Sequence, residues 1–158
     1  MLVATYLPRG SVLWIEAIDL LANPAGTTKV WNKVSEHNRS AIELNVERIE
    51  SSVRTSNGTL RKNHIADKRN FSMSWEMLPS YRTLTVDEGW GAEDLRQFYL
   101  SEDGKKTFNI RINLAKTGFD QSSSGYELYT VSFSDCSFSV LKRGLQPHWS
   151  VSLGMDEV

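Results

Sequence analysis

The sequence predicts a mainly β fold, either a β-sandwich or a flattened antiparallel barrel, with one flanking α-helix against its side or rim. Two observations lead to this prediction. Apolar and polar residues alternate with a period of two over several stretches, as they do in strands with one buried face. Only residues 89–100 carry apolar side chains at a clear helical spacing. At 158 residues the chain fits one domain with a sizeable core.

The N-terminal part of the chain leaves two structures open. The stretch SVLWIEAIDLLANPAG is compatible with a short buried strand and with a helix that ends before Pro24. We therefore treat residues 1–158 as a single domain in which the segment 1–37 has no assigned structure.

A hairpin that protrudes from the domain is predicted over residues 41–66. Apolar positions alternate through residues 42–46 and then continue on the opposite parity, which predicts a bulge or a change of face near Glu47 and Arg48. Asn57-Gly58 is a strong signal for a two-residue turn, because both residue types tolerate positive φ. The return strand then runs from Leu60 to Ile65.

The clearest strand pattern is KRNFSMSWEMLPS, residues 68–80. Its alternation places four apolar side chains on one face: Phe71, Met73, Trp75 and Met77. Ser72, Ser74 and Glu76 lie on the other face. The apolar face is expected to pack on the opposing sheet.

The helix is predicted in GWGAEDLRQFYL, with its apolar face made of Ala92, Leu95, Phe98 and Tyr99. Glu93 and Asp94 in the first turn complement the helix dipole.

Three further strands are predicted after the helix. The first has Phe108, Ile110, Ile112 and Leu114 on one face, and the loop TGFDQSSSG follows it. The second alternates on odd positions up to Phe133 and on even positions from Cys136, so a bulge is expected near Ser134 and Asp135. The last has Trp149, Val151, Leu153 and Met155 on one face.

Charge and cysteine content narrow the functional classes. A net charge of −1 gives no electrostatic reason to expect tight binding to nucleic acid or acidic lipid. Cys136 is the only cysteine, so there is no intrachain disulfide and no cysteine-rich zinc site. The N-terminus reaches Pro8 and Arg9 too early for a signal-peptide core. We expect a protein made in the cytoplasm, without a cleaved signal and without insertion into a membrane.

No pattern for catalysis or metal binding is found in the sequence. His37, His64 and His148 lack the spacing of zinc ligands, and Cys136 lies among apolar neighbours, which is typical of an inert thiol. PAGTTKVW lacks the glycine spacing of a phosphate-binding loop, and no serine stands in a nucleophile elbow. Capping explains the carboxylate pairs Asp87-Glu88 and Glu93-Asp94. The prediction is a non-enzymatic protein with no catalytic, cofactor-binding or metal-binding residues and no cofactor.

Aromatic residues provide an alternative function. Tryptophan on the surface of a β-sandwich can stack on sugars, so a carbohydrate- or receptor-binding module is the second hypothesis. Trp75, Trp90 and Trp149 share faces with aliphatic residues, however, and that pattern is more typical of core packing.

The outer arms of the hairpin favour a partner. A long polar two-stranded ribbon is marginally stable in water unless it lies on another surface, and a neighbouring subunit is the natural support. The predicted subunit interface consists of Arg54, Asn57, Gly58, Arg61 and Lys62.

Three stretches together resemble the short structural proteins of bacteriophage tails, of the tail-tube and distal-tail type. These stretches are HNRSAIELNVERIESSVRTSNGTLRKNHIADKRNFSMSWEMLPS, TVDEGWGAEDLRQFYL and YTVSFSDCSFSVLKRGLQPHWSVSLGMDEV. The resemblance lies in the order of these stretches and in their general pattern of residue types, since no short motif is diagnostic. It leaves the tube, distal-tail, terminator and connector roles open.

The resemblance implies a β-sandwich with a flanking helix and a long hairpin that engages neighbouring subunits of a ring, usually a hexamer. The implied partners are other copies of the chain, other virion tail proteins and DNA that passes without sequence-specific binding. The implied location is the tail of a virion, after synthesis in the host cytoplasm.

Overall fold

The computed structural model describes residues 12–18, 26–113, 126–142 and 147–158. Seven strands and one α-helix are seen in these ranges: β1 (Leu13–Ile18), β2 (Lys29–Lys33), β3 (Glu43–Arg54), β4 (Leu60–Pro79), α1 (Ala92–Leu100), β5 (Phe108–Asn113), β6 (Tyr126–Lys142) and β7 (His148–Glu157). A single 3₁₀ turn, η1, covers Arg82–Leu84. The N-terminal residues 1–11, Leu114 and the loop TGFDQSSSG lie outside the described residues.

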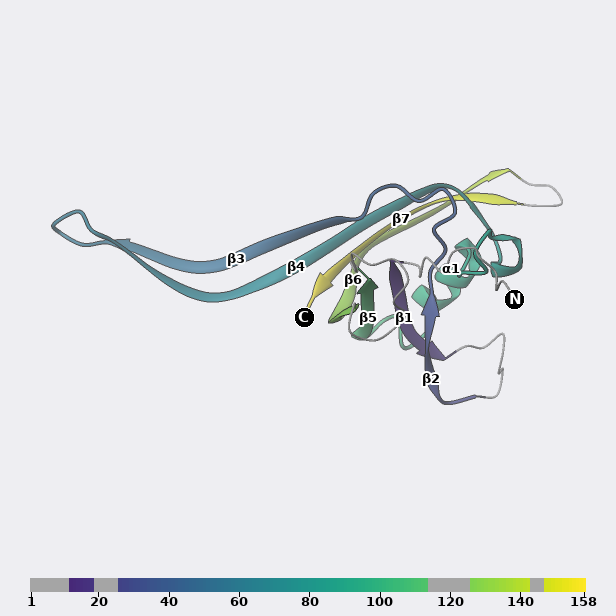
Figure 1. Ribbon diagram of the computed structural model, residues 1–158, viewed down its shortest axis with the longest axis horizontal. Coiled ribbons are helices and arrows are strands. Elements are labelled where there is room, and N and C mark those ends of the chain that lie inside the picture. Colours follow the sequence, from purple (N-terminus) through teal and green to yellow (C-terminus); the bar gives the residue numbers. More distant parts are fainter. Residues whose placement is uncertain (1–11, 19–25, 114–125, 143–146) are drawn as a thin grey trace, which may run out of the picture.

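The strands form one antiparallel sheet in the order β2-β1-β5-β6-β7-β4-β3 (Figure 1). The predicted mainly β class with one helix is therefore confirmed. Among the described residues both ends of this order are open edges, because β2 pairs only with β1 and β3 pairs only with β4.

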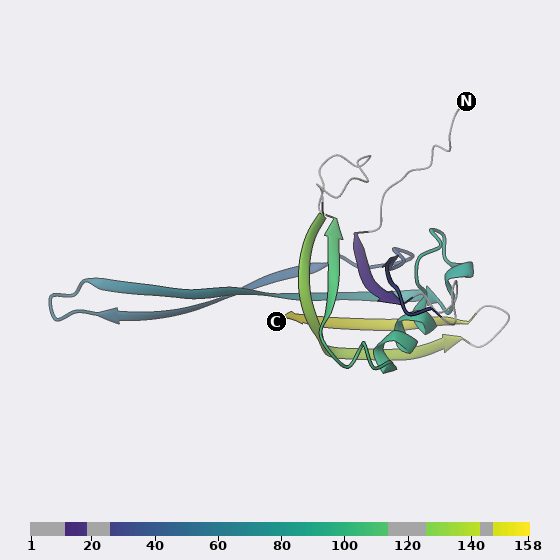
Figure 2. The ribbon, with the colours of Figure 1, turned by 90° about the horizontal axis from the view of Figure 1, so that it is seen from below.

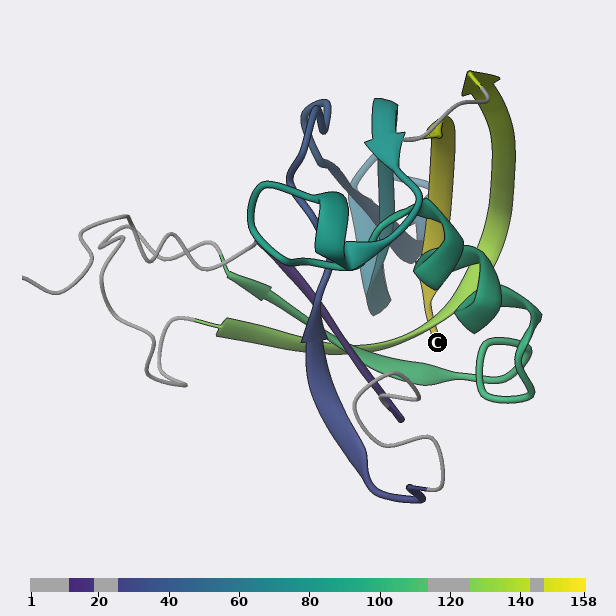
Figure 3. The ribbon, with the colours of Figure 1, turned by 90° about the vertical axis from the view of Figure 1, so that its right-hand side faces the viewer.

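One sheet makes both layers of the sandwich because β6 belongs to each of them. Its first half pairs with β5 and its second half pairs with β7, and Val131, at the junction, lies opposite both Phe108 and Glu157. Figure 3 shows β6 curving from the layer of β1 and β5 into the layer of β7 and β4. The chain from β2 to β3 crosses the open side through isolated bridges at Val34 and Arg39.

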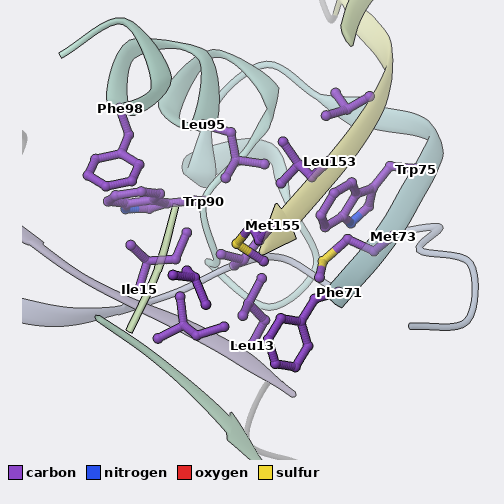
Figure 4. Packing of buried hydrophobic residues seen from close by; sticks show 14 of the residues in the cluster. Leu13, Ile15, Phe71, Met73, Trp75, Trp90, Leu95, Phe98, Leu153 and Met155 are labelled. Carbon is purple, nitrogen blue, oxygen red and sulfur yellow. The ribbon is translucent and has the colours of Figure 1, made fainter. Parts of the chain in front are cut away.

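The core lies between the two layers and is closed at one rim by α1 (Figure 4). Trp75, Leu78 and Leu153 come from one layer, and Ile15 and Ile110 come from the other. An aromatic group joins the helix to β5 and β6: the ring centroid of Phe98 lies 5.1 Å from that of Phe108, which lies 4.7 Å from that of Phe133. These contacts anchor α1 to the bend of β6.

The segment left open by the sequence contains a strand. In β1 the burial alternates strictly, with Leu13, Ile15 and Ala17 buried, so the strand alternative is correct where the chain is described. The helix alternative fails because only one side of this segment faces apolar partners, at the period of a strand.

The strand pattern of residues 68–80 is confirmed at three of its four apolar positions and wrong at the fourth. Phe71, Met73 and Trp75 are buried, whereas Met77 is exposed. The cause is a bulge: two residues of β4 separate Trp75 from Leu78, whereas only Ser150 separates their partners on β7. Leu78 therefore takes the inward place, and its side chain is fully buried.

The hairpin also differs from its prediction in three details. The return strand and the strand of residues 68–80 are one continuous strand, β4. The register shift lies between Ile49 and Glu50, beyond the predicted Glu47 and Arg48, and the unpaired residue is Ile65 on the partner strand.

The predicted bulge near Ser134 and Asp135 is confirmed.

Candidate functional site: the projecting hairpin

The β3–β4 hairpin extends far from the body of the molecule as a two-stranded arm (Figures 1 and 2). All twelve residues of β3 are exposed, and so are residues 60–65 of β4. β4 becomes buried only from Phe71 onward, where β7 covers its other edge. The arm is thus a feature that the core of its own subunit does not explain.

The tip of the arm is a turn held by backbone and side-chain hydrogen bonds within residues 54–59. The Gly58 amide donates to the Thr55 carbonyl at 2.8 Å, and the Thr55 amide donates to the Thr59 carbonyl at 2.9 Å. Gly58 has φ of +85°, but Asn57 is not in the left-handed region. The two-residue turn predicted at Asn57-Gly58 is therefore wrong, and the connection spans residues 55–59. The Asn57 carboxamide oxygen accepts from the Thr55 hydroxyl, which favours this longer turn.

One side of the arm carries two ion pairs between its strands and a His64–Asp67 contact within β4. Arg48 Nε lies 3.0 Å from Asp67 Oδ1, and His64 Nε2 lies 2.9 Å from the same oxygen. Lys62 Nζ lies 3.3 Å from Glu50 Oε1. Hydrogen bonds from His64 and Arg48 hold the pKa of the Asp67 carboxyl below its usual value. Such exposed pairs are screened by water and contribute little to stability, so they set the shape of the arm more than its stability.

Aliphatic side chains of the arm are exposed to solvent. Six of them are between 41% and 64% exposed: Leu44, Val46, Ile49, Val53, Leu60 and Ile65. Single exposed aliphatic residues are ordinary, but here they lie on both faces of one ribbon: Leu44 and Val46 on one face of β3, and Ile49 and Val53 on the other. An arm exposed in this way is suited to a protein partner. Polar composition alone drew attention to this hairpin in the sequence, whereas the exposed aliphatic residues emerge only from the structure.

The five predicted interface residues lie in the outer part of the arm. Arg54 Nη1 donates to the Gly58 carbonyl at 3.1 Å, so these two residues are in contact, and Lys62 is paired with Glu50. Arg61 lies opposite Val53 in the register, and Asn57 is part of the turn. Their role in binding a second subunit stays a prediction.

The other residues considered for chemistry have structural surroundings. His64 pairs with Asp67 on the arm, far in sequence from His37 and His148. Among the described ranges, no group of three or more His, Cys, Asp or Glu side chains could hold a metal ion. Burial raises the pKa of the Cys136 thiol to about 12, which disfavours the nucleophilic thiolate.

The two carboxylate pairs, one before α1 and one in its first turn, serve different purposes. Asp94 Oδ2 accepts from the Gly91 amide at 3.0 Å and from the Arg82 amide at 3.0 Å, so it caps α1 and holds η1. Asp87 does not cap the helix. Its carboxylate accepts from the Ser35 hydroxyl at 2.9 Å, the Glu36 amide at 3.0 Å and the Gly89 amide at 3.2 Å.

Asp87 is expected to stabilise the segment between β2 and β3 in a pH-dependent way. Burial acts to raise the pKa of its carboxyl, but the hydrogen bonds from Glu36, Ser35 and Gly89 outweigh it and lower the pKa. Its stabilisation is therefore present above the usual Asp pKa and is lost as the pH falls through the lowered value. We expect Asp87→Asn to cost about 1–3 kcal/mol at neutral pH and to flatten the acid limb of the stability curve.

The measurement is urea unfolding at a series of pH values, with Glu88→Gln as the matched control. Glu88 is exposed and adjacent, so its amide variant should unfold like the parent. Equal pH dependence for Asp87→Asn and the parent would show that Asp87 is not a pH-dependent clamp.

The five tryptophans fall into two groups. Trp75 and Trp90 are buried, and Trp149, partly buried, donates from Nε1 to the Ser80 hydroxyl at 2.7 Å. Trp14 and Trp31 lie on the outer surface of β1 and β2, where the Arg111 guanidinium is 5.2 Å and 4.6 Å from their ring centroids. The sequence analysis did not single out this outer pair.

A shallow hollow of about 150 Å³ lies beside the base of the arm. It is lined by Ser40, Ala41, Glu43, Ser72, Met73, Ser74 and Ser152. The Ser40 and Ser74 hydroxyls are 2.8 Å apart and bond to each other, and the Ser72 hydroxyl donates to Glu43 at 3.3 Å. No histidine or lysine lines the hollow, so it contains no base of the kind that activates a serine near neutral pH.

The fold matches that of a tail protein of a phage-like particle. The chain is similar to a protein in the tail of an empty gene transfer agent particle, a structure computed with C6 symmetry, with a TM-score of 0.53 and 12% identity. It is also similar to a protein in the virion of a native gene transfer agent particle, with a TM-score of 0.54 and 12% identity. Each match covers 94% of this chain and 92% of the other.

These similarities confirm, at the level of the fold, the resemblance to tail proteins. No protein-family model matches the chain, and no curated protein matches it. In the part of the chain that the structure describes, no helix is long and apolar enough to cross a membrane.

Proposed function

We propose that the protein is a structural subunit of a virion tail, a tail-tube or tail-end component that assembles with copies of itself into a ring around a DNA channel. The observation that carries this proposal is the long exposed arm on a fold shared, over 94% of the chain, with proteins of gene transfer agent particles. In this reading the protein resides in the virion tail after synthesis in the host cytoplasm, and it contacts other tail proteins.

The arm has the physical properties of an intersubunit element. β3 presents twelve residues of unpaired strand edge to solvent, because β4 is its only neighbour in the sheet. A long exposed edge with aliphatic side chains is prone to pair with another chain. A neighbouring subunit that covers this edge would bury the aliphatic side chains and satisfy the free backbone groups at the same time.

The contact is expected to be head to tail. Pairing of two β3 edges with each other would use the same surface on both copies and close a dimer, so a ring requires the arm to lie on a different surface of its neighbour. The open edge β2, at the other end of the sheet order, is one such surface. Contacts between two different surfaces generate closed rings when the rotation between copies closes. The C6 symmetry of the similar tail structure supports six copies in the ring.

The proposed role requires a surface that assembles with other subunits and does not require a catalytic site. In the hollow, the Ser40 and Ser74 hydroxyls bond to each other and the Ser72 hydroxyl donates to Glu43. Burial raises the pKa of the Cys136 thiol, and the Asp87 and Asp94 carboxylates accept backbone hydrogen bonds. Each of these groups thus has a structural role in the described ranges. We propose a non-enzymatic protein on this basis.

The second candidate is a carbohydrate- or receptor-binding module, and the observation that favours it is the outer pair Trp14 and Trp31. Arg111 lies over both rings, however, and so occupies the surface on which a sugar would stack. Quenching of tryptophan fluorescence by glycans, lost in Trp31→Ala, would support this candidate.

Sedimentation velocity over a range of concentrations tests the proposed assembly. Six copies of the 17.9 kDa chain give a particle of about 107 kDa, and we expect a concentration-dependent boundary of this size or of a multiple of it. A single 17.9 kDa species up to high concentration would contradict self-assembly.

A further inference from the structure

The outer surface of the β6–β7–β4 layer has an unusual composition. Register places eleven residues on this surface in cross-strand rows: Asn70, Asp156 and Ser132; Ser72, Gly154 and Asp135; Ser74, Ser152 and Ser137; Ser150 and Ser139. We call these eleven residues the serine face. Seven are serines, two are aspartates, and none is basic, aliphatic or aromatic. All eleven are exposed or half-buried.

The fold keeps this face continuous through the bulge in β6. In β6 the residues that face the core have odd numbers up to Phe133 and even numbers from Cys136 onward. If β6 ran through Ser134 as a regular strand without the bulge, strict alternation would turn Cys136 and Phe138 outward and bury Ser137 and Ser139. A Cβ at position 154 would lie 2.9 Å from the Ser134 hydroxyl, so Gly154 makes room for the bulge.

The outer surface of the other layer is different. Register places Trp14 and Glu16 of β1, Trp31 and Lys33 of β2, and Arg111 of β5 on it, and we call these five residues the tryptophan face. Arginine and lysine bind phosphates, and tryptophan stacks on bases and sugars. The two outer surfaces of the sandwich therefore differ in how strongly they would hold a polyanion.

We propose that the serine face lines the channel and forms a non-adhesive wall past which duplex DNA moves; this rests on the ring assembly proposed above. DNA that moves through a channel is slowed by each contact of its phosphates with lysine or arginine, because such contacts supply most of the nonspecific affinity for DNA. None of the eleven residues of the serine face is lysine or arginine. The next residue of β4 on this side, Lys68, lies at the end of the face, and its ammonium donates to the Val158 carbonyl at 2.7 Å. The hydroxyls of the serine face exchange readily with water, and Asp135 and Asp156 repel phosphates over about 8–10 Å at physiological salt.

The inference also assigns the opposite surface. If the serine face points to the ring axis, the tryptophan face lies on the far side of the sandwich and points away from the channel. The arm then continues from the channel-lining layer, since β4 belongs to both.

Labelling with a maleimide gold cluster tests the assignment directly. In a Cys136→Ser background, Ser152→Cys places the label on the serine face and Asn109→Cys places it on the outer surface of β5. We expect averaged electron micrographs of the assembled rings to show gold at the centre for Ser152→Cys and at the rim for Asn109→Cys. Gold at the rim for Ser152→Cys would overturn the assignment.

A second position, Ser137→Cys, guards against a variant that fails to assemble, because Ser137 lies opposite Ser152 in the register. Absence of rings in the unsubstituted protein would instead refute the proposed function, so the two failures are distinguishable.

Introduced lysines test the non-adhesive character. Ser74 and Ser152 are cross-strand partners, and so are Asn109 and Thr130 of the other layer. We expect the pair Ser74→Lys and Ser152→Lys to raise the affinity of assembled rings for a short DNA duplex by about tenfold or more at low salt, because each ring would surround the duplex with lysines. The pair Asn109→Lys and Thr130→Lys should have a smaller effect. Equal effects of the two pairs on assembled rings would contradict a channel lined by the serine face.

Discussion

Replacing Trp75 with alanine is expected to lower the free energy of unfolding by roughly 3–5 kcal/mol, the usual cost of removing a large buried aromatic side chain. Trp75 is only 1% exposed and lies at the centre of the core. Its Nε1 also donates to the Ser35 carbonyl at 2.8 Å, a buried bond that reaches the segment between β2 and β3. The variant therefore loses both the packing and the attachment of that segment. Chemical denaturation monitored by circular dichroism measures the loss.

Ser74→Ala is the control for this prediction, because Ser74 is the adjacent residue on the opposite face of β4. Its hydroxyl bonds to that of Ser40 near the surface, so its loss should cost about 1 kcal/mol or less. Trp75→Phe should fall between the two, since it retains most of the apolar contact and loses the hydrogen bond. Equal unfolding midpoints for Trp75→Ala and Ser74→Ala would mean that the buried face of β4 has been assigned incorrectly.

Shortening the arm is expected to abolish self-assembly while the body stays folded. Ile49 and Ala66 are cross-strand partners, so replacing residues 50–65 with Asn-Gly closes the hairpin with a two-residue turn. The removed residues are almost all exposed and contribute little to the core. We expect the shortened chain to unfold near the parent's midpoint and to sediment as a monomer. Rings that form unchanged from the shortened chain would refute the role of the arm.

Two milder variants separate the chemistry of the arm from its length. Val53→Asp places a charge on an aliphatic residue of the arm that is 63% exposed, and Leu128→Asp does the same at a 66% exposed residue of β6. We expect Val53→Asp to weaken assembly by at least about tenfold, or 1.4 kcal/mol, and Leu128→Asp to have a small effect. Reversing the charges of Arg54 and Arg61 should weaken assembly as well. Similar losses for Val53→Asp and Leu128→Asp would mean that assembly responds to surface charge in general.

Most of the fold could be predicted from the sequence because one-sided burial leaves a period of two in each strand. The strands around Trp75, Ile110 and Val151 were predicted in this way. The exception at Met77 has a local cause: a bulge changes parity without changing residue type, so alternation through Met77 looked unbroken. β1 could not be distinguished from a helix, because a short run of apolar residues fits both periods and only its neighbours β2 and β5 decide between them.

The candidate site was less predictable than the fold. The hairpin could be located from its polar strands and its Asn-Gly pair, but not its length, because β4 continues through residues that the sequence divides into two strands. The exposure of Ile49, Val53 and Ile65 was also hidden, since aliphatic residues in a strand ordinarily indicate a buried face. The serine face can be recognised only from the register of three strands, β4, β7 and β6. β4 is far in the sequence from the other two, so the sequence alone does not bring their residues together.

The most direct test of the account is cryo-electron microscopy of the full chain, purified and concentrated without other tail proteins. We expect closed rings in which the β3–β4 arm of each copy lies on the neighbouring copy. The exposed edge and the aliphatic side chains of the arm should be buried in this contact. Monomers, or rings in which the arm folds back onto its own subunit or extends into solvent without touching another chain, would contradict the account.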